Sequence, residues 1–388
     1  MFSDRRHYAV ALAAMAAFLN LYAPQALLPH LAGEFGVGAG DIGLIMTASS
    51  LSVALTAPFT GAVADVIGRK RLISAAVLLL ILPTVMVALS QSLDAMIFWR
   101  FVQGLLLPPI FAVTVAYIGD EWSAVEATGV TGLFVSASSI GGFLGRFLTG
   151  VVSDAIGWRG AFLVDAGLTA CCALGIVLLL PREKRFVKAA SIAASLRQMV
   201  RHLGNPGLLA TYAVGFGVLF NFIATFTYVN FLLAAPPYNL PPSLLGSIFV
   251  VYLLGTVTSA LTGRAVARFG RRTFVIGAIL IWICGILLTL VPSLPAIIGG
   301  LAVAAACGMV CQASSTSYVS TSATGGVSSA VGLYVTAFYT GGSVGAYLPG
   351  HFWALGGWPG TVALIVASLL IMVAIVALFW RESRKHSA

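Results

Sequence analysis

Long apolar stretches alternate with short polar breaks along almost the whole chain. A helix needs roughly 20 apolar residues to cross a bilayer, and most of these stretches reach that length. They predict twelve membrane-spanning helices, at residues 8–32, 42–63, 72–91, 94–118, 128–152, 158–180, 207–234, 243–266, 273–291, 294–319, 328–352 and 358–380. The pattern therefore predicts an all-α membrane protein with too little remaining chain for a sizeable soluble domain.

The second half of the chain repeats the first. Residues 132–150 and 332–350 are identical at nine of 19 positions when shifted by 200 without gaps, and Gly141, Gly142, Gly145 and Gly150 are among the residues that recur. Repeats at such spacing indicate two copies of one structural unit. We therefore predict two pseudo-symmetric six-helix bundles, at residues 1–180 and 207–388. The basic segment 181–206 between them is predicted to be a cytoplasmic linker on the membrane surface.

Composition agrees with a membrane protein, and the distribution of charge predicts its orientation. The chain is 59 % hydrophobic and 9 % charged, whereas soluble domains carry about 25 % charged residues. Of the 21 Lys and Arg residues, 18 fall in the tails and loops that would share one face. Cytoplasmic loops carry this excess, so both termini are predicted to be cytoplasmic. The net charge of +9 then reflects topology rather than nucleic-acid binding.

Enzymatic and metal chemistry find no support in the sequence. No nucleophile motif, phosphate-binding glycine loop or metal-ligand cluster is recognisable. All five cysteines lie inside apolar stretches, where buried thiols are more common than disulfides or metal ligands. We expect no enzymatic activity, no cofactor and no metal. Transport would then be driven by an ion gradient or by the gradient of the substrate itself.

A glycine-rich, basic turn joins the second and third predicted helices. Residues 61–71 read GAVADVIGRKR. Gly68 suits a backbone position with positive φ, and Gly61 is expected to let two helices approach closely. Asp65 and Arg69 stand at helix ends, where charges cap helices or form pairs.

This turn resembles the signature loop of the major facilitator superfamily, written G-x-x-x-D-x-x-G-R-[KR]. The resemblance implies a twelve-helix transporter that works by alternating access. It also implies a conformational latch made by Gly61, Asp65, Gly68, Arg69 and Asp120, in which Asp65 contacts the eleventh helix. A second copy of the loop spans residues 263–272, with Ala267 in place of the aspartate.

Two arginines lie inside predicted spans. Arg100 and Gln103 match the superfamily's R-x-x-Q-G motif, which implies that Arg100 faces the central cavity and takes part in proton coupling. A structural role, with Arg100 bound to an acid or to carbonyls, is the alternative. Residues 141–150 resemble the motif G-x-x-x-G-P-x-x-G-G of the drug:proton antiporter branch at Gly141, Gly145 and Gly150, but Arg146 stands where that branch carries proline. Arg146 is either a functional residue or the partner of an acid. Its counterpart in the second half is Ala346, so packing does not demand the charge.

Asp165 is the only acid deep in an apolar stretch. At 1.5 Å per residue, it and the two arginines lie roughly 6–10 Å below one membrane face. We therefore expect the three charges to form one polar cluster, with one arginine left for an anionic substrate or backbone carbonyls. Asp165 serves either in proton coupling or as a structural counter-ion.

Other polar side chains inside the spans are candidates for the substrate cavity. These are Asn20, Tyr22, Gln25, Gln103, Asn221, Thr225, Tyr228 and Gln312. Hydrogen bonds between helices would explain any one of them equally well.

The predicted function is secondary active transport by alternating access, with proton-coupled efflux of an amphipathic compound or drug favoured. The alternative is a proton-coupled or uncoupled transporter of a small organic anion, sugar or metabolite. A membrane receptor or assembly factor is disfavoured by the repeat and by the intact loop. The expected partners are a small-molecule substrate, protons and the lipid bilayer, without nucleic acid. We expect a monomer in a bacterial-type inner membrane.

Overall fold

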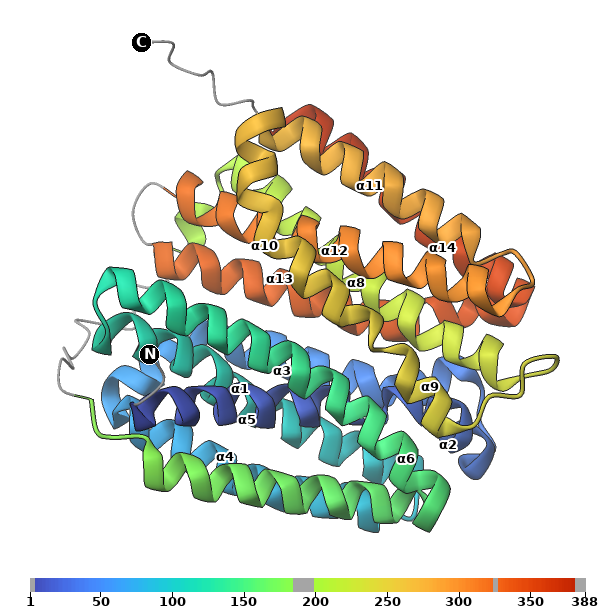
Figure 1. Ribbon diagram of the computed structural model, residues 1–388, viewed down its shortest axis with the longest axis horizontal. Coiled ribbons are helices and arrows are strands. Elements are labelled where there is room, and N and C mark those ends of the chain that lie inside the picture. Colours follow the sequence, from blue (N-terminus) through green and yellow to red (C-terminus); the bar gives the residue numbers. More distant parts are fainter. Residues whose placement is uncertain (1–3, 184–198, 324–326, 381–388) are drawn as a thin grey trace. The chain divides into compact units, whose positions relative to one another are not determined.

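The computed structural model describes residues 4–183, 199–323 and 327–380, which are helical almost throughout (Figure 1). The predicted linker, residues 181–206, lies mostly outside these described residues. The first seven elements are α1 (Arg5–Tyr22), the 3-10 helix η1 (Ala23–Ala26), α2 (Leu28–Phe35), α3 (Ala39–Ile67), α4 (Arg69–Leu89), α5 (Leu93–Glu121) and α6 (Ala124–Leu179). After the linker follow α8 (Pro206–Ala234), α9 (Pro242–Ile248), α10 (Val251–Phe269), α11 (Arg271–Leu288), α12 (Leu294–Ser322), α13 (Val327–Tyr347) and α14 (Pro349–Phe379).

The predicted spans are all found among these helices. Ten helices in the described residues are long and apolar enough to cross a membrane. One of them, Val125–Leu179, holds two predicted spans, because the chain turns at Gly157. The span 8–32 is made by α1, η1 and α2 together, and α9 with α10 makes the span 243–266. The all-α membrane architecture is confirmed.

Glycines with positive φ recur in pairs and mark the repeat in the backbone. Gly68 has φ +95° and Gly270 has φ +79°, each between two helices. Gly157 has φ +81° and Gly357 has φ +58°, each at the turn before the last span of its half. Side chains with a Cβ rarely adopt this conformation, so both pairs of turns depend on glycine.

A second set of repeated glycines permits close helix packing. A Cβ added at Gly141 on α6 would lie 2.7 Å from the backbone of Met15 on α1. At the repeated position, a Cβ on Gly341 of α13 would lie 2.8 Å from the Cα atom of Phe216 on α8. Small residues at such crossings allow two membrane helices to pack closely. Both halves have a glycine at the equivalent crossing.

By their contacts, the residues form two compact units. One takes Met1–Ile192 together with Val229–Val250, and the other takes Ala193–Tyr228 together with Val251–Ala388. Val229–Val250 therefore packs with the first unit, although it belongs by sequence to the second repeat. The predicted bundle boundaries follow the repeat and stay a prediction.

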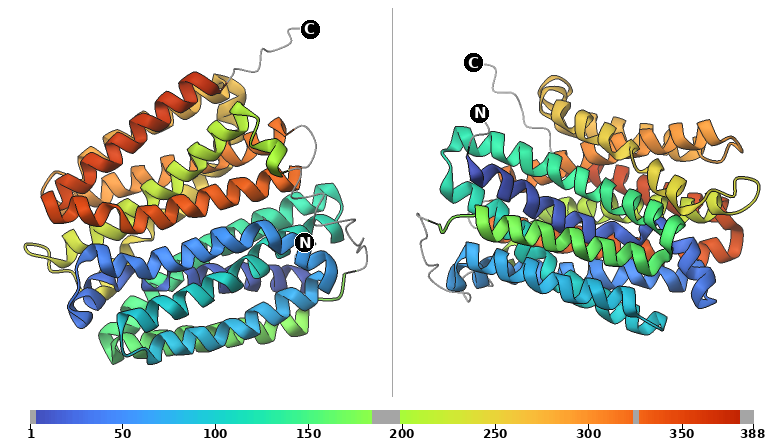
Figure 2. Two further views of the ribbon diagram at one scale, coloured as in Figure 1. Left: turned by 180° about the vertical axis from the view of Figure 1, so that it is seen from behind. Right: turned by 60° about the horizontal axis from the view of Figure 1, so that its bottom comes forward.

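Within the first unit, α1 packs against α6, while α5 packs against both α3 and α4 (Figures 1 and 2). Within the second, α12 packs against α10 and α11.

Apolar and polar side chains are distributed as a bilayer requires. Many large apolar side chains are exposed, among them Leu178 at 70 % and Leu378 at 77 %. Asn20, Gln103 and Asn221 are instead buried, at 1 % exposure or less. Lipid takes the place of water around the spans, so the outer faces are apolar and polar groups must find partners inside.

Candidate functional site

The helix of the first predicted span is broken at Pro24, and Arg100 supplies hydrogen-bond donors at the break. Proline has no N–H, so it cannot donate to the carbonyl of the residue four positions earlier, which is Asn20. Arg100 of α5 supplies the missing donors: Nη1 donates to the Asn20 carbonyl at 2.8 Å and Nη2 to the Leu21 carbonyl at 2.7 Å. The helix continues as η1 from Ala23. A buried guanidinium thus replaces the backbone donor that proline lacks.

Arg100 also belongs to a hydrogen-bonded network that crosses the first unit. Its Nη1 donates to Gln103 Oε1 at 2.7 Å, and Gln103 Nε2 donates to Thr84 Oγ1 at 2.8 Å. Thr84 donates to Asn20 Oδ1 at 2.8 Å, and Asn20 Nδ2 donates to Thr169 Oγ1 at 2.7 Å. The network links α1, α4, α5 and α6. Satisfied buried networks of this kind hold helices in one arrangement.

All the acceptors of Arg100 are neutral oxygens. This agrees with the structural alternative in which Arg100 is bound to carbonyls. Besides those above, Nη2 donates to Ser49 Oγ at 2.8 Å. Arg100 is 1 % exposed. Its implied part in proton coupling stays a prediction.

Arg146 forms a second site beside the same break. Its Nε donates to Gln25 Oε1 at 2.7 Å and its Nη1 to the Gly142 carbonyl at 2.6 Å. The guanidinium carbon lies 4.0 Å from the ring centre of Tyr22 and 4.4 Å from that of Phe249. Aromatic faces attract cations, most strongly where water is excluded. The structure thus brings Tyr22, Gln25 and Arg146 together, as candidates for one site.

Residues from the second repeat complete this site within the first unit. Asn230 Nδ2 donates to the Gln25 carbonyl at 2.9 Å. A Cβ added at Gly246 of α9 would lie 2.5 Å from the Arg146 carbonyl oxygen, so the two backbones touch. Phe249 was missed by the sequence reasoning, because an apolar residue in an apolar stretch carries no signal of a cation partner.

Asp165 forms no ion pair with Arg100 or Arg146, although Arg100 lies near enough to act electrostatically on its carboxylate. It is 3 % exposed, its Oδ2 accepts no hydrogen bond, and its carboxylate meets no Lys or Arg nitrogen within 4 Å among the described residues. Its neighbours include Leu19, Thr149 and Leu168. The depth estimate did not say which way each side chain points, and Arg100 donates to the backbone carbonyls at the break instead.

The predicted latch residues meet at the turn between α3 and α4. Arg69 Nη2 lies 2.7 Å from Asp120 Oδ2 and 3.9 Å from Asp65 Oδ1. The close approach expected at Gly61 is not found, since a Cβ there would meet nothing within 4 Å. Gly61 lies on an open part of α3.

Glu183 joins the latch and was missed by the sequence reasoning. Its carboxylate accepts from the backbone N–H groups of Arg69 at 2.9 Å and Lys70 at 3.2 Å. It therefore caps the N-terminus of α4, where a negative charge is favourable. A Cβ on Gly68 would lie 2.6 Å from its Oε1. The available signal was an acid directly after the sixth span.

The cavity candidates of the second half differ in whether their side chains make hydrogen bonds. Asn221 Nδ2 donates to Ser368 Oγ at 3.1 Å, and the Tyr228 hydroxyl donates to the Ala346 carbonyl at 2.8 Å. The buried Thr225 hydroxyl has no hydrogen-bond partner in the described part of the chain. Gln312 is half-buried, and its side-chain amide makes no hydrogen bond to the described residues. The polar side-chain atoms of Thr225 and Gln312 thus make no hydrogen bond to the described residues, and their place in a substrate cavity stays a prediction.

The described residues contain no group of three or more His, Cys, Asp or Glu side chains that could hold a metal ion. The cysteines are free thiols.

Comparison with known proteins identifies the family of this chain. The family model described as Major Facilitator Superfamily matches residues 10–236 and 214–388. An "Uncharacterized transporter" of Buchnera aphidicola is 27 % identical over 365 residues, covering 94 % of this chain and 88 % of the relative. The "Inner membrane transport protein YnfM" of Escherichia coli is 29 % identical over 369 residues, covering 94 % and 87 %.

A solved structure shares the fold. The crystal structure of the nucleoside transporter NupG aligns with a TM-score of 0.76 at 12 % identity, covering 97 % of this chain and all of that one. At this identity the likeness speaks for the architecture alone.

Proposed function

Because this chain belongs to the major facilitator superfamily and is a membrane transporter of that family, we propose that it exports a small amphipathic compound in exchange for protons. Transport proceeds by alternating access, in which the two repeats rock about a site near the middle of the membrane.

The observation that supports proton coupling is the burial of Asp165 without an ion pair. It is the only buried acid among the described residues. The spans of the second half contain no acid that could take the place of Asp165, because no Asp or Glu lies between Glu183 and Glu382. An ionised carboxylate without a hydrogen bond or a cation is costly to bury. Asp165 therefore carries a proton in this environment and releases it when a conformational change brings water or a cation to it.

The latch sets the rate of exchange between conformations. Arg69 holds α4 to Asp120 at the end of α5, and Glu183 ties the same turn to the end of α6. We propose that these pairs break and re-form in each cycle, and that Asp65 takes part through its predicted contact with the eleventh helix.

A second candidate function rests on Arg146. The buried charged side chains among the described residues are Arg100, Arg146 and Asp165, so the membrane interior carries an excess of positive charge. Arg100 is held by the break in the first span, whereas Arg146 lies between two aromatic rings next to Gln25. An organic anion, such as an acidic sugar or a small metabolite, would be attracted to this site.

The proposed location is the inner membrane of a bacterium, with both termini in the cytoplasm. The supporting observations are the bacterial relatives and the basic loops on one face. Fusions of a periplasmic and a cytoplasmic reporter enzyme to the C-terminus test the orientation, and only the cytoplasmic reporter should be active.

Substrate-driven pH change in proteoliposomes tests the function. Purified protein is reconstituted with a pH-sensitive dye inside the vesicles, and cationic, neutral and anionic compounds are added in turn. Proton movement with cationic or neutral amphipathic compounds supports the exchanger. A response to anions alone that is lost in Arg146→Ala supports the second candidate. Substrate flux without any pH change rejects proton coupling.

A further inference from the structure

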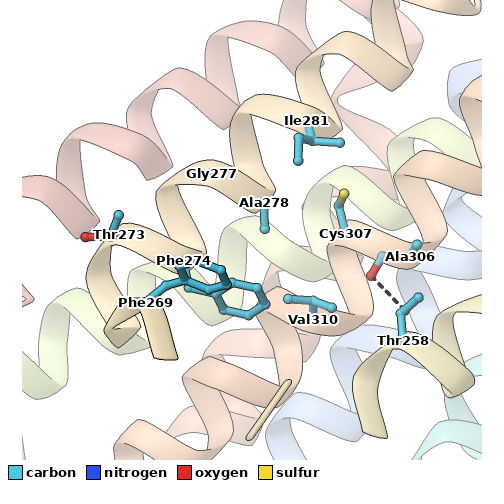
Figure 3. A pocket seen from close by; sticks show the side chains of 10 residues that line it. All are labelled: Thr258, Phe269, Thr273, Phe274, Gly277, Ala278, Ile281, Ala306, Cys307 and Val310. Carbon is cyan, nitrogen blue, oxygen red and sulfur yellow. Dashed lines mark hydrogen bonds between the residues drawn. The ribbon is translucent and has the colours of Figure 1, made fainter. Parts of the chain in front are cut away.

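The second unit contains an apolar crevice of about 370 Å³ between α10, α11 and α12 (Figure 3). This size falls within the range of roughly 300–1,000 Å³ seen for ligand pockets. The lining residues are Thr258, Phe269, Thr273, Phe274, Gly277, Ala278, Ile281, Ala306, Cys307 and Val310. From Thr273 to Ile281 the crevice follows α11 for about 12 Å at 1.5 Å per residue.

Small residues create the hollow. Gly277 and Ala278 on α11 lie near Ala306 and Cys307 on α12, so neither helix fills the space between them (Figure 3). A Cβ at Gly277 would meet nothing within 4 Å. The Thr258 hydroxyl donates to the carbonyls of Gly255 at 3.0 Å and Ala306 at 3.4 Å, which leaves its methyl group for the wall. Phe269 and Ile281 are each 57 % exposed, so the crevice opens on the outer surface of the unit.

One end of the crevice lies at a turn rich in arginine. Phe269 and Phe274 line this end and flank Gly270. The Arg268 guanidinium lies 5.4 Å from the ring centre of Phe269. Arg264 and Arg268 are exposed and Arg272 is half-buried.

These positive charges have no acidic partner among the described residues of their own half. No Asp or Glu lies between Glu183 and Glu382, and no ion pair joins Arg264, Arg268 or Arg272 to any described residue. The corresponding turn of the first half is different, since Asp65, Asp120 and Glu183 surround Arg69 there.

We propose that the crevice binds one acyl chain of an anionic phospholipid whose phosphate lies against Arg268 and Arg272. The crevice opens on the outer surface of membrane helices, where the surroundings are lipid tails. Basic clusters at the cytoplasmic ends of such helices attract anionic headgroups. An apolar channel that ends at unneutralised arginines complements a molecule with an apolar chain and a negative head. This site is independent of the transported substrate.

Native mass spectrometry of the purified, delipidated full-length protein tests the site. The probes are phosphatidylglycerol and phosphatidylcholine with identical acyl chains. The wild type should bind phosphatidylglycerol more tightly. The double variant Arg268→Ala/Arg272→Ala should lose about fivefold of that preference for each arginine removed. The matched control Lys70→Ala/Arg71→Ala removes two charges from the first-half turn and should keep the preference.

A second variant tests the chain-binding part. Gly277→Leu places a side chain in the open space of the crevice and should weaken binding of both lipids. Gly263→Leu is the control, because Gly263 is also open on its helix but does not line the crevice. Thermal unfolding of each variant in detergent verifies that it is folded. Equal binding of the two lipids by the wild type would overturn the proposal. So would an unchanged preference in the double arginine variant, or unchanged lipid binding in Gly277→Leu.

Discussion

The first helix of each half carries an asparagine at the same place in the repeat, and its surroundings differ between the halves. Asn20 donates to the Ala16 carbonyl and to Thr169, and Asn221 donates to the Gly217 carbonyl and to Ser368. Each asparagine thus joins the first helix of its half to a hydroxyl on the last. Both halves make this hydrogen bond, but the residues around it differ.

Four residues after each asparagine the halves diverge. The first has Pro24, and the second has Thr225, which leaves α8 unbroken over Pro206–Ala234. At the position of Arg100, α12 carries Leu301, since α5 and α12 are both 29 residues long and start 201 residues apart. The arginine occurs where the helix is broken, and leucine occurs where it is not. The buried charge and the helix break therefore occur together.

The two basic turns differ in a related way. Arg69 pairs with Asp120 at 2.7 Å, whereas Arg271 donates to the Thr321 hydroxyl at 3.3 Å and the Ser317 hydroxyl at 3.4 Å. Asp65 has Ala267 as its counterpart. The first turn is held by an ion pair, and the second by hydrogen bonds to neutral hydroxyl groups.

The largest change in stability is expected from Arg100→Leu, which gives the first half the residue found in the second. Arg100→Leu removes the donors to the Asn20 and Leu21 carbonyls, and unsatisfied buried groups cost about 1–3 kcal/mol each. The free energy of unfolding should fall by about 3–5 kcal/mol. Thermal unfolding of the purified protein in detergent measures it. Arg159→Leu is the matched control, because Arg159 pairs with Glu34 on the surface, where such pairs contribute roughly 0–1 kcal/mol.

Adding Pro24→Thr to Arg100→Leu should restore part of the lost stability. Threonine returns a backbone N–H, which can donate to the Asn20 carbonyl. If the double variant is no more stable than Arg100→Leu alone, the proposed link between the break and the arginine is wrong.

A smaller effect is expected at the latch. Asp120→Asn replaces a charge-assisted contact of the half-buried Arg69 with a neutral one and should cost about 1 kcal/mol. Conformational exchange should become faster, as followed by spin-label distance measurements in membranes. Thr321→Ala in the second turn should change stability by less than about 0.5 kcal/mol. Equal effects of the two substitutions would remove the distinction between an ionic and a neutral turn.

The smallest effect is expected at the cap of α4. Glu183→Gln keeps an acceptor but loses the charge at the helix N-terminus, which contributes about 0.3–1 kcal/mol. Amide hydrogen exchange at Arg69 and Lys70 should become up to about fivefold faster. Glu34→Gln should leave these amides unchanged. Unaltered exchange in Glu183→Gln would show that the cap does not hold the turn.

Periodicity and repeats in the sequence predicted most of the fold. The apolar stretches placed the spans, and the glycine at position 68 was predicted to adopt a positive φ. The positive φ of Gly270, Gly157 and Gly357 was not predicted, although it follows the repeat. These features follow from local chemistry, namely the length of an apolar run and the conformational freedom of glycine.

The site was harder to predict because it depends on how each helix is rotated. Distance along a helix placed Arg100, Arg146 and Asp165 at one depth, but only packing decides which neighbours they face. Phe249 and Glu183 come from segments distant in sequence and carry no motif. Pro24 did hold a usable signal, since a proline inside a span leaves a carbonyl that needs a donor.

Reconstituted protein can show whether Asp165 carries the exchanged proton. Wild type, Asp165→Asn and the exposed control Asp94→Asn are reconstituted in proteoliposomes, and substrate exchange is measured beside substrate-driven proton movement. If Asp165 carries the proton, Asp165→Asn should retain substrate exchange and lose proton movement, while Asp94→Asn behaves as the wild type. Wild-type proton movement in Asp165→Asn would contradict the account.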